Sequence, residues 1–152
     1  MRKTTTAFLL AATCAMAGAS LVHAAGKKLP AGPIHDRHEL MEGIGKNAKV
    51  IGDALKTGKL DPVAEAARQI HADAGKALAL FPKGSTHPNS RALDEIWADW
   101  EKFEHINKDL EAKSGELATV ASSGGDVGKA AKAMFDTCTS CHDDFRKPEE
   151  KH

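Results

Sequence analysis

Apolar residues recur at intervals of three and four positions through four stretches of the chain, and this spacing limits the fold more than any other feature. Such a repeat gives a helix one continuous apolar face, whereas a half-buried strand needs strict alternation. The four stretches cover 34–55, 62–81, 93–121 and 127–145. Segments rich in glycine, proline and serine separate them at 58–62, 81–90 and 122–126. The pattern predicts an all-α, antiparallel, up-down-up-down four-helix bundle.

Two aspartates mark the expected starts of the second and fourth helices. Asp61 stands directly before Pro62, and proline is favoured at the first helical position because the N–H that it lacks has no partner there. Asp126 precedes Val127 without a proline. We expect both carboxylates to accept hydrogen bonds from free backbone N–H groups at these helix starts.

The first 24 residues have the three-part pattern of a secretory signal peptide. Arg2 and Lys3 give a positive start, and an apolar run follows over 7–17. Small residues then precede a cleavage point before Ala25. The apolar run is shorter than a membrane span requires, although a retained anchor is the alternative. We expect residues 1–24 to be removed on export to the periplasm, which leaves one domain over 25–152.

The charge of the exported domain restricts its partners. Loss of the leader removes two basic residues and no acidic ones, so 19 basic residues stand against 21 acidic ones. A nearly neutral, slightly acidic chain argues against nucleic acid as a partner. The mature form is also expected to have no membrane span. Two cysteines remain in it, only three positions apart.

These cysteines belong to the segment Cys138-Thr139-Ser140-Cys141-His142, which has the C-x-x-C-H signature of covalent haem attachment. Thiols at positions i and i+3 lie on one helical face, where each can form a thioether with a haem vinyl group. The adjacent imidazole can then bind the iron. A redox dithiol and half of a zinc site are the alternatives. The first lacks its usual βαβ context, and the second lacks another cysteine pair.

The chain resembles the class II c-type cytochromes, the cytochrome c prime family, from about Pro33 to Lys147. The resemblance implies a four-helix bundle with one haem c, attached through two thioethers to Cys138 and Cys141 and ligated by His142. Four segments carry the resemblance: Arg37-x-x-x-Met41, Leu80-Phe81-Pro82-Lys83-Gly84-Ser85, Ile96-Trp97-Ala98-Asp99-Trp100 and Cys138-Thr139-Ser140-Cys141-His142-Asp143-Asp144-Phe145-Arg146.

The resemblance also raises the question of the second axial ligand. High-spin members of the family cover the open haem face with an apolar side chain and bind nitric oxide or carbon monoxide. Low-spin members bind the iron through a methionine. Met41 stands four residues after Arg37, on the expected inward face, at a height in the bundle similar to that of His142. We expect Met41 to ligate the iron, and a flexible core residue is the alternative.

Arg37 falls on the same inward face, where a charge is costly unless it is paired. The family resemblance suggests that it pairs with a haem propionate. The alternative is that its side chain reaches solvent, because the first helix begins nearby.

The expected function is one-electron transfer in the periplasm by a single haem with His142 and Met41 as axial ligands. The alternative is a five-coordinate protein that binds nitric oxide or carbon monoxide. An enzyme is not expected, because no distal histidine with a nearby arginine can be assigned. Redox proteins are the expected partners. A homodimer is left open, because Gly45, Gly52 and Ala66 would permit a close contact between copies or would serve the core.

Overall fold

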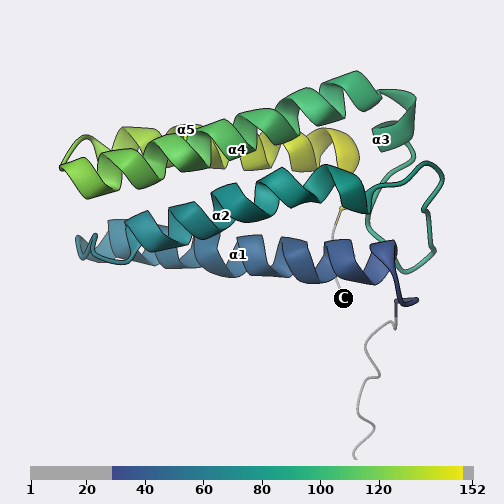
Figure 1. The fold of residues 1–152 in the computed structure, drawn as a ribbon, viewed down its shortest axis with the longest axis horizontal. Helices are drawn as coiled ribbons and strands as arrows, with labels where there is room; N and C mark the ends of the chain where they lie inside the picture. Colours follow the sequence, from purple (N-terminus) through teal and green to yellow (C-terminus); the bar gives the residue numbers. More distant parts are fainter. Residues whose placement is uncertain (1–28, 149–152) are drawn as a thin grey trace, which may run out of the picture.

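The computed structural model describes residues 29–148, and its helices confirm the predicted four-helix bundle (Figure 1). The proposed signal peptide, 1–24, lies outside the described residues. Within the described range, none of the helices has the length and apolar character of a membrane span. The elements are α1 (Pro33–Thr57), α2 (Val63–Ala77), the 3-10 turn η1 (Leu78–Leu80), α3 (Glu95–Ala98), α4 (Trp100–Ser123) and α5 (Val127–Phe145).

The four long helices run antiparallel in chain order, so the molecule has two unlike ends (Figure 1). At one end the short turns after α1 and α4 close the bundle. At the other end lie the start of α1, the end of α2, the loop with α3, and the end of α5. α1 packs closely on α2, α2 on α4 and α4 on α5, whereas α1 and α5 touch at only a few residues. The seam between α1 and α5 is therefore the least closed side of the bundle.

Helix ends follow from local backbone chemistry at several positions. Gly58 and Gly124 adopt left-handed conformations after α1 and α4, with φ of 72° and 81°, which glycine reaches without strain. Asp126 begins α5 as predicted, and its carboxylate accepts a 2.9 Å hydrogen bond from Lys129 N. The prediction for Asp61 was wrong. α2 begins at Val63, and no side-chain hydrogen bond caps it.

The stretch 93–121, predicted as one helix, is divided at Asp99. The backbone of Asp99 (φ −125°, ψ 59°) leaves the helical region and separates α3 from α4. Its carboxylate then accepts a hydrogen bond from Lys102 N at 3.3 Å, so one residue ends the first helix and caps the second. The second predicted helix is also shorter than expected. α2 ends at Ala77 and tightens into η1 before Phe81.

Two hydrophobic clusters occupy the interior. The aliphatic core fills most of the bundle, and its residues include Ile51, Ile70, Leu117 and Met134, each fully buried. The aromatic cluster lies at the end that holds α3. Its buried members are Phe81, Ile96, Phe103, Ile106 and Phe145. We call this end of the molecule the aromatic end.

Candidate haem-binding site

The last turns of α5 bring the two cysteines to the aromatic end. Cys138 and Cys141 are three positions apart on this helix, both are half-buried, and both are free thiols. Cys141 packs against the aromatic cluster, whose member Phe145 follows four residues later on the same helix. The thiols therefore share one face of α5, as thioether attachment to one haem requires.

The thiols are poorly suited to the alternatives of redox or zinc chemistry. Burial raises the pKa of Cys138, and burial together with the nearby Cys138 and Asp144 raises the pKa of Cys141 to about 11. Reactive cysteines instead have lowered pKa values, because the thiolate is the nucleophile. In the part of the chain that the structure describes, neither cysteine belongs to a cluster of three metal-ligating side chains.

His142 follows Cys141 directly and remains accessible at the end of α5. Its pKa is lowered, first because part of the ring is desolvated and then because Arg146 and Arg91 are positively charged. Arg146 Nη1 lies 3.3 Å from His142 Nδ1. The guanidinium can only donate, and the lowered pKa of His142 favours its neutral imidazole. A neutral imidazole is the form that binds a metal.

The backbone after His142 is fixed by the loop that precedes α3. Leu93 N donates to Phe145 O at 3.0 Å, and Lys147 N donates to Arg91 O at 2.8 Å. These bonds flank an isolated antiparallel bridge between Ala92 and Arg146. The end of α5 is thus held against the same loop that borders the aromatic cluster.

Arg37 is a buried cation with neutral partners. The residue is 4% exposed, so it does not reach solvent, contrary to the alternative considered from the sequence. Its guanidinium donates to Ser85 Oγ at 2.8 Å, to Ser85 O at 2.7 Å and to Ser90 Oγ at 3.0 Å. Burial lowers its pKa, yet arginine stays protonated in proteins. Among the described residues no carboxylate pairs with it.

Aromatic rings surround this cation. The Arg37 Cζ lies 5.0 Å from the centre of the Phe81 ring and 5.9 Å from that of Trp97, distances at which ring faces attract a cation. Phe103 joins the two sides of the cluster, since its ring centre lies 4.9 Å from Phe81 and 5.3 Å from Phe145. The aromatic cluster therefore links Arg37 on α1 to the end of α5.

Met41 lies one helical turn after Arg37 on α1 and is half-buried. Its side chain packs against both the aliphatic core and the aromatic cluster. Cys141 packs against the same aromatic cluster from α5. The fold therefore brings Arg37, Met41 and Cys141 to one region, on the two helices that scarcely touch each other.

Two other side chains of types that bind iron, one histidine and one methionine, do not face this region. His38 is exposed, with its Nε2 3.3 Å from Glu42 Oε1 on the surface of α1. Met134 is fully buried within the aliphatic core. Of the three small residues considered for a contact between copies, Ala66 is buried and belongs to the core. Gly45 and Gly52 have open space beside them, where a side chain would meet no other atoms.

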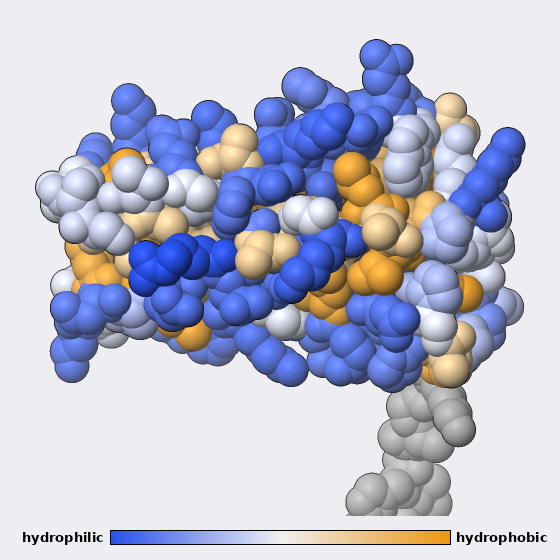
Figure 2. Space-filling view, in the orientation of Figure 1, coloured by the Kyte–Doolittle hydropathy of each residue, from blue (hydrophilic) through white to orange (hydrophobic). Residues whose placement is uncertain are grey.

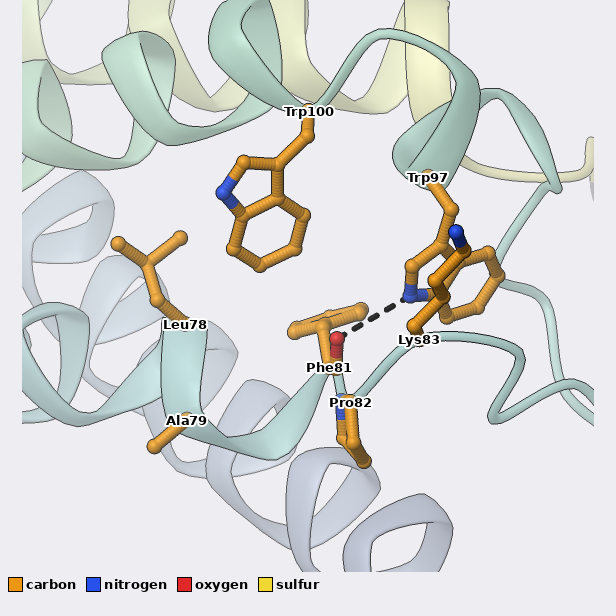
Figure 3. Close-up of a pocket in the computed structure, with 7 residues that line it drawn as sticks. All are labelled: Leu78, Ala79, Phe81, Pro82, Lys83, Trp97 and Trp100. Carbon is orange, nitrogen blue, oxygen red and sulfur yellow. Dashed lines mark hydrogen bonds between the residues drawn. The ribbon is translucent and has the colours of Figure 1, made fainter.

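A cavity of about 440 Å³ lies where η1 and the segment after it face α3 and the start of α4 (Figure 3). Hydrophobic side chains reach the surface near it, between α2 and α4 (Figure 2). Trp97 Nε1 donates to Phe81 O at 3.1 Å across its wall. The cavity contains none of the residues predicted to hold haem, so we do not assign haem to it. Its lining residues are Leu78, Ala79, Phe81, Pro82, Lys83, Trp97 and Trp100.

The residues at the α1–α5 seam fit haem c. Two free thiols share a helical face, a neutral imidazole stands beside them, and the buried Arg37 has no acidic partner within residues 29–148. A haem would use all three kinds of group, because its vinyl groups take the thiols, its iron takes the imidazole and its propionates are anionic. The sequence did not indicate that Ser85 and Ser90 hold Arg37. Ser85 belongs to the segment 80–85 that carries the family resemblance. Its hydrogen bond to Arg37 joins positions 48 residues apart, however, and a local sequence pattern does not reveal such a contact.

Comparison with known proteins places the same residues in a family. The family profile described as Cytochrome C' matches residues 32–146. A cytochrome c' from Rhodopseudomonas palustris is 36% identical over 121 residues, which cover 74% of this chain and 80% of the relative. One from Pararhodospirillum photometricum is 30% identical over 126 residues, covering 78% and 98%. The solved cytochrome c prime from Shewanella frigidimarina superposes with a TM-score of 0.73 at 25% identity, covering 80% and 98%.

Proposed function

The chain belongs to the cytochrome c' family and carries covalently attached haem c, and on this premise we propose that it binds a diatomic gas such as nitric oxide or carbon monoxide. The haem would supply an iron that can bind the gas. Cys138 and Cys141 would hold the haem, His142 would ligate the iron, and Arg37 would pair with a propionate. Met41 would cover the side of the iron where the gas binds.

Membership of the cytochrome c' family is the observation that carries this proposal. The packing of Met41 is compatible with it, because the side chain contacts both the aliphatic core and the aromatic cluster, as an apolar covering residue would. Members of the family typically have five-coordinate, high-spin iron. The predicted His142–Met41 ligation, and with it the low-spin subgroup, therefore lacks support. A thioether on an inward face serves packing as readily as ligation, so the position of Met41 alone does not indicate a ligand.

A one-electron carrier remains the second candidate, for one specific reason. Met41 and Cys141 pack against the same aromatic cluster, so a thioether sulfur lies on the side of the bundle where the haem is attached. A methionine ligand would raise the reduction potential and exclude gases from the iron. Redox proteins would then be the partners. Neither candidate requires catalysis of a chemical reaction by the protein.

Carbon monoxide binding to three forms of the ferrous protein separates the two candidates. If Met41 only covers the iron, the unmutated protein binds carbon monoxide readily and Met41→Leu changes the rate little, because the apolar volume is nearly conserved. Met41→Ala opens the face and speeds binding. If Met41 ligates the iron, the unmutated protein binds poorly and Met41→Leu gains rapid binding. Met134→Leu, in the aliphatic core, is the matched control for loss of a buried methionine.

We further propose a periplasmic location and association into a homodimer. The location follows from the leader predicted at 1–24 and from family membership. Open space beside Gly45 and Gly52 on α1 would allow another helix to approach closely. Sedimentation of the haem-loaded protein tests the assembly, since a single species with the mass of one chain would exclude a stable dimer.

A further inference from the structure

Four residues at the start of α1 form an exposed strip of metal-ligating side chains. His35, His38, Glu39 and Glu42 stand at positions i, i+3, i+4 and i+7, which lie on one face of a helix. All four are exposed, whereas Arg37 on the same turns is buried. The strip thus takes no part in the haem site described above.

The donor atoms of this strip lie close together. One ligand atom from each of His38, Glu39 and Glu42 falls within 4.8 Å of the other two. His38 Nε2 is 3.3 Å from Glu42 Oε1, and His35 Nε2 is 4.0 Å from Glu39 Oε1. Within residues 29–148 this is the one cluster of three such donors.

These spacings suit a tetrahedral transition-metal ion. Zinc binds imidazole nitrogen and carboxylate oxygen at about 2.0–2.2 Å, which sets neighbouring ligand atoms about 3.4 Å apart. Closing the cluster from its present spread therefore needs only side-chain rotations, and exposed side chains make these readily. The mixture of imidazole and carboxylate also favours zinc, copper or nickel over magnesium or calcium.

Two neighbouring charged side chains contact members of the strip, and a metal ion would have to displace them or bind beside them. Lys46 Nζ lies 3.6 Å from Glu42 Oε2, and Asp36 Oδ1 lies 3.7 Å from His35 Nδ1. Both are contacts between exposed side chains, and such pairs contribute only about 0.2–1 kcal/mol. A divalent ion with three ligands displaces the lysine, because chelation replaces one weak ion pair with several coordinate bonds.

We propose that His38, Glu39 and Glu42 bind a divalent transition-metal ion such as Zn²⁺, with His35 available as a fourth ligand. The site belongs to a single chain. An ion bound there cross-links side chains on successive turns at the start of α1. The same turns contain Arg37. Because the ion binds only the folded helix, it raises the melting temperature of the protein.

Calorimetric titration of Zn²⁺ into untagged, haem-loaded protein tests the site. The haem-loaded form is used because thioether-bound cysteines do not compete for zinc. We expect one ion per chain, and at least about tenfold weaker binding for both His38→Ala and Glu42→Gln. The matched control is His105→Ala, which removes an exposed histidine paired with Asp109 at 3.5 Å on α4. It should change the dissociation constant less than twofold.

Three results would overturn the proposal. The first is equal Zn²⁺ affinity for the unmutated protein and His38→Ala, and the second is that His105→Ala weakens binding as much as His38→Ala does. A ratio of one ion to two chains would also contradict a site within one chain. Circular dichroism on each variant confirms that α1 remains folded, so that weaker binding reports lost ligands. Because the carbon monoxide measurements above do not depend on this strip, either proposal can fail while the other stands.

Discussion

The two ends of the bundle are built from different kinds of residue and meet different requirements. Where short turns join the helices, the core closes on itself, and Ile51, Val63 and Leu117 are fully buried. At the aromatic end, Cys141 and Met41 remain half-buried, and Arg37 is buried without an acidic partner among the described residues. At the first end the side chains pack against one another and need no further partner. At the aromatic end, two thiols, an imidazole and the guanidinium of Arg37 are of the kinds that can bind a haem.

The difference shows where stability and function are located in this fold. A fully buried aliphatic residue contributes free energy through apolar area and close packing, whatever the cofactor does. Arg37 contributes little that way, because burial of a cation is costly unless a counter-charge offsets it. We therefore propose that the aromatic end holds an anion beside Arg37, and that the aliphatic core supports this end at a distance.

The largest expected effect removes the covalent attachment at the aromatic end. The double variant Cys138→Ala/Cys141→Ala should retain no haem in a denaturing gel and should release any bound haem into acidified organic solvent. The unmutated protein should keep its haem under both treatments, because two thioethers hold it. Ser140→Ala, between the cysteines, is the control and should behave as the unmutated protein does. Freely extractable haem in the unmutated protein would refute covalent attachment.

The next effect concerns stability at the opposite end. Leu117→Ala should lower the free energy of unfolding by about 2–5 kcal/mol, because it removes a fully buried side chain and leaves a cavity. The haem spectrum should stay unchanged, since Leu117 belongs to the aliphatic core. Denaturant unfolding and absorption spectra measure the two quantities. A large spectral change with little loss of stability would mean that the two ends are not separate.

A smaller effect is expected from the buried cation. Arg37→Gln should lower the midpoint potential. Ferric haem carries one more positive charge than ferrous haem, so loss of the Arg37 charge removes a repulsion that destabilises the ferric state. A tenfold shift in the oxidation equilibrium corresponds to about 59 mV for one electron, and we expect a change of up to roughly that size. Arg68→Gln is the control, because Arg68 forms an exposed pair with Glu65 at 2.9 Å. An unchanged or higher potential for Arg37→Gln would refute the propionate partner.

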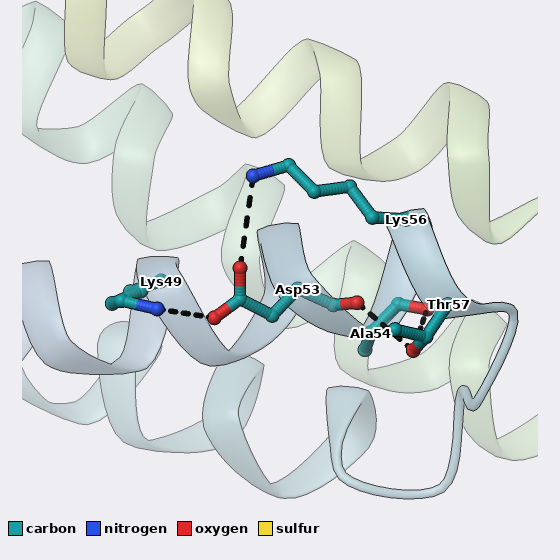
Figure 4. A network of polar contacts seen from close by, with 5 residues as sticks. All are labelled: Lys49, Asp53, Ala54, Lys56 and Thr57. Atoms are coloured by element: carbon teal, nitrogen blue, oxygen red, sulfur yellow. Dashed lines mark hydrogen bonds and ion pairs between the residues drawn. The ribbon is translucent and has the colours of Figure 1, made fainter.

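The smallest effect belongs to a surface network on α1, in the half of the helix away from Arg37 (Figure 4). Asp53 binds Lys49 and lies 3.6 Å from Lys56, and its pKa is lowered mainly by the hydrogen bond from Lys49. A lowered carboxyl pKa stabilises the folded state above the usual pKa, and this contribution is lost as pH falls through the folded-state value. Asp53→Asn should therefore reduce the melting temperature slightly at neutral pH. The difference from the unmutated protein should vanish in acid, as thermal melts at several pH values would show.

The sequence predicted the bundle well because periodicity is a local property. Spacing alone located four apolar faces, and the carboxylate of Asp126 caps α5 as expected. The spacing did not predict the break at Asp99, where one residue ends α3 and caps α4. The apolar pattern continues through this position, so it indicated a single helix. Cys138, Cys141 and His142 were recognisable because their motif is contiguous.

The surroundings of Arg37 were harder to predict. An inward stripe showed that the residue faces the core, but not that serines from a distant loop would hold it. Met41 illustrates a further limit, because its position on the helix could be deduced while its chemical role could not. Packing and ligation both place a methionine on an inward face.

The spin state of the iron in the unmutated ferric protein tests the central claim most directly. If Met41 covers the open face without binding the iron, electron paramagnetic resonance at neutral pH should show high-spin, five-coordinate haem. The reduced protein should likewise lack the sharp α band of low-spin haem. A low-spin ferric signal together with that sharp band would contradict the account, and would favour the methionine-ligated electron carrier.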